Sequence, residues 1–321
     1  MAFRLKLVPA VTKIDFFRYW KVTFGASVLA MVIGIVSLFT QGLALGIDFQ
    51  GGTSIRTETA NPVNIGEWRE SLTALNLGDV TITEVFDPGF RPDQHVAQVR
   101  VQGDVTGEVT PAQVVERVEA ALLAIDPSLE FTSVESVGPK VSGELMFTAI
   151  LSLSLASLGI LIYIWLRFEW QFAVGAVVAL VHDAFLTVAF WSVFQFKFDL
   201  TIVAAVLTII GYSVNDTVVV FDRVRENLIK YKTMPLKDLL NLTINETLSR
   251  TIMTSTTTML ALIAMFSFGG DVIRGFIAAM MFGVMVGIYS TVYVASVIVL
   301  MTGINRNPTR DKAGTQFNTS A

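Results

Sequence analysis

The sequence predicts a polytopic α-helical membrane protein with six transmembrane helices and one α/β domain inserted between the first and second of them. Three observations lead to this fold class. The chain of 321 residues is 53% hydrophobic and only 16% charged, whereas soluble domains carry about 25% charged residues. Its mean hydropathy is +0.61. Its apolar residues gather in six long stretches, and a polar, acidic segment separates the first stretch from the second.

Each apolar stretch approaches the length of about 20 residues that a spanning helix requires. The stretches cover residues 22–39, 145–166, 172–194, 200–221, 252–268 and 276–302. The first is about 18 residues long, which exceeds the usual apolar core of a signal peptide. We therefore expect a first transmembrane span over residues 22–42 rather than a cleaved signal peptide.

Basic residues predict the orientation, because Lys and Arg concentrate in cytoplasmic segments. They gather in the N-terminal tail (1–21), in the loop between the fourth and fifth spans (223–250) and in the C-terminal tail (303–321). Within this loop a helix is predicted around residues 236–248. We therefore expect both tails, and this loop of the membrane domain (141–302), in the cytoplasm. The inserted domain (43–140) then lies on the opposite side.

Composition excludes several classes of protein. The segment 43–140 carries 15 acidic and 6 basic side chains, and the rest of the chain carries 12 and 17. This distribution gives no support to nucleic-acid binding. The chain has no cysteine and two histidines. A disulfide framework and a thiol nucleophile are therefore excluded, and neither a metal centre nor a cofactor is expected.

The inserted domain reads as a ferredoxin-like α/β fold. Strands are predicted over 53–59, 80–86, 95–102 and 130–137 from their alternating pattern. Helices are predicted over 64–75, with Asn64 as the N-cap, and over 110–125, where Thr110, Pro111 and Gln113 form a capping-box signature. The order βαββαβ is that of the ferredoxin-like arrangement. No catalytic constellation is visible, so we expect a domain that docks or contacts substrate, and not an enzyme.

Ionisable residues inside the spans are the first candidates for function, because charge in a bilayer is costly. Asp216 lies near the end of the fourth span, and Arg250 begins the fifth. Consecutive spans are neighbours, so the two side chains are predicted to lie within reach of each other. We interpret Asp216 as a proton carrier whose pairing with Arg250 changes as one helix moves. A static buried ion pair, or a snorkelling Arg250, is the alternative.

Further polar residues suggest a proton path through the membrane. The candidates are His182, Asp183, Tyr212, Asn215, Thr254, Thr257 and Thr258. Hydroxyl groups on one helix face can relay protons, but they also hold helices together, and the sequence leaves both roles open. His182 and Asp183 are adjacent, so their side chains point roughly 100° apart on a helix and need not interact.

Two glycine-bearing segments flank the inserted domain and are predicted to be stiff junctions with the membrane. The first contains Gly46, Asp48, Phe49, Gly51 and Gly52, and the second contains Gly138 and Pro139. Glycine permits the positive φ values that sharp turns require. The first segment lacks the lysine and the following helix of a phosphate-binding loop.

Together these motifs resemble the signature segments of the SecF family. The segments are 46–52, 137–145, 167–170, 179–183, 211–223 and 248–251. The resemblance covers nearly the whole chain except the tails and the interior of the inserted domain. It implies a fold related to the resistance–nodulation–division exporters. It also implies a location in the bacterial inner membrane, with the inserted domain in the periplasm.

The resemblance further implies a function in late steps of protein export, driven by the proton-motive force, with Asp216 and Arg250 in proton coupling. It implies SecD, SecYEG, YajC and YidC as protein partners and an unfolded preprotein as substrate. The alternatives are a proton-driven small-molecule exporter of the related superfamily and an assembly scaffold without a transport cycle. Sodium instead of protons, and the stoichiometry with SecD, are left open by the sequence.

Overall fold

The computed structural model describes residues 12–78, 80–85, 90–91, 94–102, 109–269 and 271–304. Within these ranges, six helical spans are long and apolar enough to cross a membrane, as the sequence predicts. They are α1 (Trp20–Thr40), α5 (Pro139–Arg167), α6 (Trp170–Phe194), α7 (Leu200–Lys230), α8 (Leu236–Phe268), and a last span made of α9 (Asp271–Ser290), η1 (Thr291–Ala295) and α10 (Ser296–Thr302). The predicted tail residues 1–11 and 305–321 lie outside the described residues.

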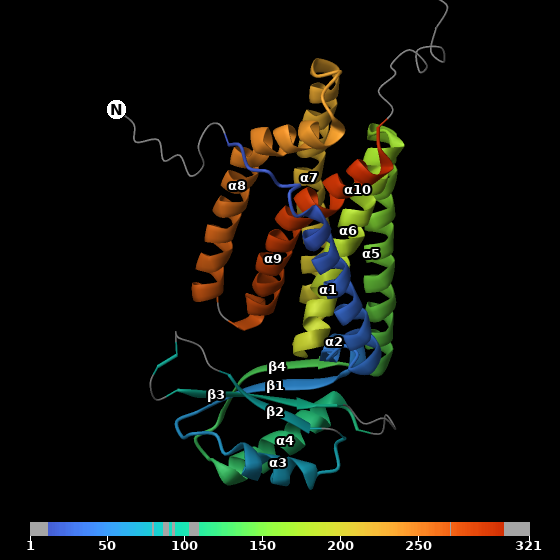
Figure 1. The fold of residues 1–321 in the computed structure, drawn as a ribbon. Coiled ribbons are helices and arrows are strands. Elements are labelled where there is room, and N and C mark those ends of the chain that lie inside the picture. The colour runs from blue at the N-terminus through green and yellow to red at the C-terminus, as the bar shows by residue number, and fades with distance from the viewer. Residues whose placement is uncertain are drawn as a thin grey trace, which may run out of the picture.

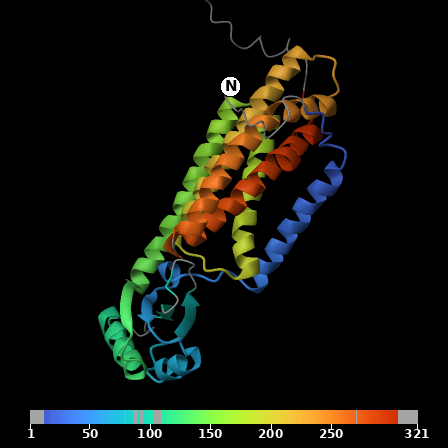
Figure 2. The same cartoon turned by 90° about the vertical axis from the view of Figure 1, so that its left-hand side faces the viewer.

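The six spans form one bundle in which α6, α7 and the last span are the most buried (Figures 1 and 2). Aromatic rings of Phe168, Phe172 and Phe221 pack together where α5, α6 and α7 meet. In contrast, α1, α5 and α8 keep broad apolar faces exposed, as expected of surfaces that meet lipid or another transmembrane protein.

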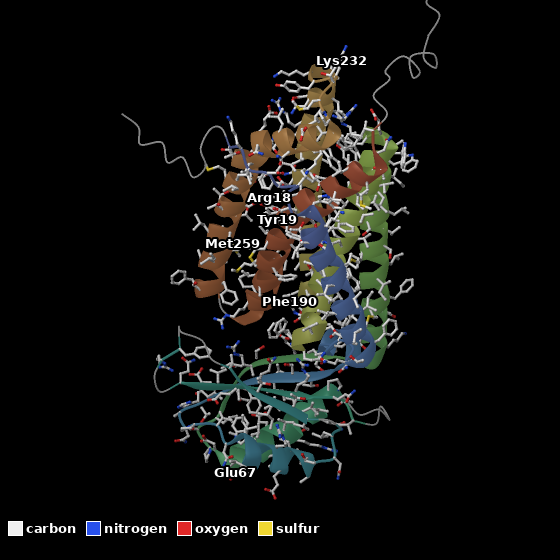
Figure 3. The ribbon with its side chains drawn as sticks, in the orientation of Figure 1. Arg18, Tyr19, Glu67, Phe190, Lys232 and Met259 are labelled. Atoms are coloured by element: carbon white, nitrogen blue, oxygen red, sulfur yellow. The ribbon has the colours of Figure 1, made fainter. Side chains whose placement is uncertain are left out.

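The loop 223–250 contains the helix that the sequence predicts around residues 236–248, and its helical part is longer than predicted. Most of it is helical, since α7 continues to Lys230 and α8 already begins at Leu236. The reason is amphipathicity beyond the membrane span: Leu239, Leu240 and Ile244 are buried against the rest of the bundle. This end of the molecule carries Lys232, and Glu67 marks the opposite end (Figure 3).

The inserted domain has the predicted ferredoxin-like fold. Its elements are β1 (Gly52–Thr59), α3 (Ile65–Thr73), β2 (Val80–Val85), β3 (His95–Val101), α4 (Pro111–Ile125) and β4 (Glu130–Val137), and a short helix α2 (Ile47–Gln50) precedes them. The strands are antiparallel in the order β2-β3-β1-β4. Asn64 caps α3, and Thr110 closes the predicted capping box of α4.

The sheet lies between α3 and α4 on one face and the ends of the membrane helices on the other (Figure 1). Ile55 and Val99 are opposite each other in register and fully buried, so alternate residues of each strand fill the core beneath the helices. Ser54, Arg56, Gln98, Ser133 and Glu135 lie on the other face of the sheet, toward the membrane helices, and place a largely hydrophilic layer between the two parts of the protein.

Candidate functional site

Asp216 lies on α7 and faces α8. Its carboxylate accepts a hydrogen bond from the Thr251 hydroxyl at 2.7 Å. The second carboxylate oxygen, Oδ2, is buried and has no hydrogen-bond partner among the described residues. A buried oxygen in this state can take up a proton or another donor, because an unmade hydrogen bond is costly.

Arg250 does not form the predicted ion pair in this structure. No nitrogen of Arg250 lies within 4.0 Å of the Asp216 carboxylate among the described contacts. Neighbouring residues on a helix point roughly 100° apart. Thr251 therefore turns toward α7, while Arg250 lies on the exposed side of α8.

The threonines of α8 do not form a continuous hydroxyl chain. Thr254 and Thr257 are exposed, and their hydroxyls donate to carbonyl oxygens of their own helix at 2.9–3.1 Å. Tyr212 reaches Thr258 at 3.5 Å, and Asn215 is exposed on α7. Local bonding of this kind favours a packing role for Thr254 and Thr257 in this conformation.

His182 and Asp183 are in direct contact, a point that the sequence left open. The distance from His182 Nδ1 to Asp183 Oδ1 is 2.9 Å. Two serine hydroxyls donate to Asp183 Oδ2, Ser213 of α7 at 2.5 Å and Ser290 of α9 at 2.6 Å. Asp183 is completely buried. The two side chains converge because Asp183 turns toward α7 and α9 and the flexible χ angles of His182 let its ring reach back.

This polar group continues along the interface between α7 and the last span. The hydroxyls of Thr217 and Thr291 are 3.0 Å apart, and Thr291 donates to the Gly287 carbonyl at 3.0 Å. Directly afterwards the helix widens into the π-helical turn η1. Such turns are frequent at functional sites. Ser213, Thr217, Thr251, Ser290 and Thr291 were not singled out as site residues in the sequence, because serine and threonine abound in helix interfaces.

The predicted junction before the domain is held to the start of α7. Asp48 Oδ2 accepts the backbone N–H of Leu200, the first residue of α7, at 3.0 Å, next to the N-cap residue Asp199. The Gly46 N–H donates to the Phe198 carbonyl at 2.7 Å. Phe49 packs against Phe198 with ring centroids 6.1 Å apart. The first glycine-bearing segment therefore clamps the domain to the α6–α7 connection.

Glycine serves two different purposes in these junctions. Gly51 and Gly52 have positive φ values of 75° and 123°, as predicted for a sharp turn. Gly46 has an ordinary φ, but a Cβ there would lie 3.1 Å from Asp199 Cβ, so close packing explains it. Gly138 also has an ordinary φ and is the N-cap of α5, which begins at Pro139.

A polar cavity of about 510 Å³ lies between the sheet and the ends of the membrane helices. Its lining includes Arg56 and Glu135 from the sheet and Lys197 and Asp199 from the α6–α7 connection. Burial lowers the pKa of Lys197. Burial also lowers the pKa of Arg100 on β3, although Asp199 and Asp48 oppose this effect. The contact between the inserted domain and the α6–α7 connection, called the clamp below, therefore includes a cluster of partly desolvated charges of both signs.

This fold defines a class: a six-span membrane protein with one ferredoxin-like insert, polar residues buried among its spans and a clamped domain junction. Comparison with known proteins agrees with this class. The model of the family described as "Protein export membrane protein SecD/SecF, C-terminal" matches residues 117–305, and the "SecD/SecF GG Motif" matches residues 36–63. The latter contains the clamp segment.

Curated relatives match along the full length. The protein translocase subunit SecF of Cereibacter sphaeroides is 60% identical over 99% of this chain and 98% of its own length. The protein translocase subunit SecDF of Brucella abortus is 39% identical over 95% of this chain, which spans 39% of that longer protein. The chain therefore belongs to the SecF family of protein translocase subunits, as the motifs indicated.

A solved structure confirms the fold. The crystal structure of SecDF, a translocon-associated membrane protein from Thermus thermophilus, aligns with a TM-score of 0.80 at 30% identity. The alignment covers 92% of this chain and 39% of that one. The present chain thus corresponds to about two fifths of a fused SecDF chain, and it is a multi-pass membrane protein.

Proposed function

We propose that this translocase subunit uses the proton-motive force to promote late steps of protein export, with Asp216 as the proton carrier. The observation that carries the proposal is the unequal bonding of its carboxylate: Thr251 binds one oxygen, and the other is buried without a partner. Arg250, on the same helix as Thr251, supplies a positive charge that a rotation of α8 brings toward this oxygen.

We propose SecD as the direct partner, and that it covers the polar faces of α7 and α8. Polar groups on a transmembrane surface favour contact with protein over lipid. Exposed residues on these faces are Ala204, Thr208, Gly211 and Asn215 of α7 and Arg250, Thr254 and Thr257 of α8. The small size of Ala204, Thr208 and Gly211 suits close helix packing. Relatives in which SecD and SecF form one SecDF chain support this pairing.

Wider assembly and location follow from the same proposal. The complex acts in the bacterial inner membrane with SecYEG, YajC and YidC, and the inserted domain contacts the unfolded preprotein on the periplasmic side. The orientation has a direct test, because the chain has no cysteine. Glu67→Cys and Lys232→Cys lie at opposite ends of the molecule (Figure 3). An impermeant maleimide added to intact cells should label the former and not the latter, and the reverse pattern would overturn the orientation.

Asp216→Asn tests the proposed proton coupling. In cells lacking the native protein, we expect export of a secreted precursor to fall toward the level of the empty strain while the variant keeps wild-type abundance. Asp238→Asn is the matched control, since it removes an exposed carboxylate at the start of α8. Normal export with Asp216→Asn would refute proton coupling through this residue and favour a scaffold. Export that follows a sodium gradient instead would identify sodium as the coupling ion. Loss of drug efflux with normal export would favour the small-molecule exporter.

A further inference from the structure

The buried group around Asp183 is complete within this chain, unlike the half-exposed site at Asp216. His182, Ser213 and Ser290 supply all the hydrogen bonds to its carboxylate, from three different helices. A lone carboxylate in a dry interior is costly unless a positive charge accompanies it. No Lys or Arg forms an ion pair with Asp183 among the described contacts. A proton is therefore the compensating charge that the surroundings allow.

Geometry decides where this proton sits. His182 Nε2 is buried without a hydrogen-bond partner among the described residues, so a proton there would leave an unsatisfied donor. A proton on Asp183 Oδ2 meets the Ser290 oxygen at 2.6 Å. The Ser290 hydroxyl has a second acceptor, the Gly287 carbonyl at 3.1 Å. Ser290 can therefore donate to Asp183 or accept from it.

We propose that His182 and Asp183 form a second proton-binding centre, in which Ser290 changes its acceptor with the protonation state. When one proton enters, it binds Asp183 Oδ2, the new O–H donates to Ser290 Oγ, and the Ser290 O–H turns to the Gly287 carbonyl. Release reverses these movements, and His182 stays neutral with its proton on Nδ1. A hydrogen bond to an ionised group is roughly twice as strong as a neutral one, so protonation loosens α9 from α6.

Other titratable groups around the pair are few. From α9, Tyr289 stacks on His182 with ring centroids 6.5 Å apart, and Tyr293 of η1 packs against Tyr289. On α7, Tyr212 precedes Ser213, and Asp216 follows it by one helical turn. α10 has no titratable residue. The titratable residues of α1 and α5 are exposed, and they are Lys21, Lys140, Glu144, Tyr163 and Arg167. Asp216 is thus the one other carboxylate close to this centre among the described residues.

Infrared difference spectroscopy of the full chain with SecD in lipid nanodiscs tests the proposal. Between about pH 5 and 9, we expect a pH-dependent band of a protonated carboxyl group that isotope labelling assigns to aspartate. The band should be lost in Asp183→Asn and kept in Asp216→Asn. Ser290→Ala should shift the frequency of the band, because the carboxyl O–H loses its acceptor, whereas a purely structural aspartate gives no band to shift.

The histidine partner has an independent readout. His95 is the other histidine of the chain, so in a His95→Gln background 15N-histidine NMR reports His182 alone. We expect a neutral ring protonated on Nδ1 throughout the pH range. An imidazolium signal, or a carboxyl band unchanged in Asp183→Asn, would overturn the proposal. The proposal rests on the proposed function only in assuming that the bound proton is used for export. Normal export with Asp216→Asn would refute coupling through Asp216, but it would leave these spectra unaffected.

Discussion

Replacing Gly283 by alanine is expected to force α9 away from α7. A Cβ at this position would lie 2.7 Å from Ile209 Cγ2, and closer still to Cγ1 and Cδ1 of the same side chain. Carbon atoms in contact rest at about 3.5–4.0 Å. Ile209 is 1% exposed and β-branched, so it has no free space and few rotamers into which it can turn. The two helices must therefore separate.

The net cost combines two opposing effects. Overpacking a buried site costs about 1–3 kcal/mol, and alanine gains up to about 1 kcal/mol over glycine in a helix. We expect the free energy of unfolding to fall by about 1–2 kcal/mol, measured by titration with SDS in mixed micelles. Gly25→Ala on α1 is the matched control, because its Cβ would meet nothing within 4 Å; it should be neutral or stabilising.

A second variant isolates the steric cause. Ile209→Ala removes the carbon atoms that a Cβ at position 283 would meet, so the double variant should be more stable than the sum of the two single effects by about 1 kcal/mol or more. The reasoning is refuted if Gly283→Ala unfolds like the wild type, or if the double variant shows simple additivity. The contact also matters for the site, since the same pair of helices presents Ser213 and Ser290 to Asp183.

Three further changes probe the clamp, the inserted domain and the proposed SecD surface. Asp48→Ala removes the acceptor of the Leu200 N–H and should lower the free energy of unfolding by about 1–2 kcal/mol, with faster proteolysis at the junction; unchanged proteolysis would contradict the clamp. Asp126→Asn should destabilise the chain by about 1 kcal/mol at neutral pH. Hydrogen bonds, above all the one from Ser128, hold the pKa of this carboxyl well below its usual range. Their stabilising effect is therefore present above the unfolded-state pKa of about 4. The thermal-unfolding difference should shrink as the pH falls below that value, and a difference that persists in acid would contradict this cause. Gly211→Ala should leave the chain stable, because its Cβ would meet nothing within 4 Å, yet reduce copurification with SecD; undiminished copurification would place the interface elsewhere.

The sequence predicts the elements of this fold well, because each has a local signal. The capping box at Thr110 and the alternation over β1 and β3 are properties of short segments, and apolar length identifies the spans. The sequence predicts the helix around 236–248 but not the continuation of α7 to Lys230, because the burial of Val224 against the bundle depends on tertiary contacts.

The sequence predicted candidate residues for the site, but it did not predict which of their side chains are in contact. Asp183 takes its partners from positions 30 and 107 residues away, which no local pattern encodes. At Asp216 the choice between Arg250 and Thr251 depends on the rotation of α8 about its axis, and adjacent residues exchange places when a helix turns by roughly 100°. Whether Asp216 and Arg250 couple protons to export stays a prediction.

The position of Asp216 on α7 gives a physical reason why the inserted domain should follow events inside the membrane. At about 1.5 Å per residue, the 31 residues of α7 form a continuous rod of roughly 46 Å. Asp48 holds one end of the rod at Leu200, and Ser213 and Asp216 lie midway along it. A helix without a proline or a π-helical turn does not bend sharply, and α7 has neither. A rotation of α7 about its own axis that moves Asp216 relative to α8 therefore also turns the end to which the domain is clamped, and a separate transmission element is not required.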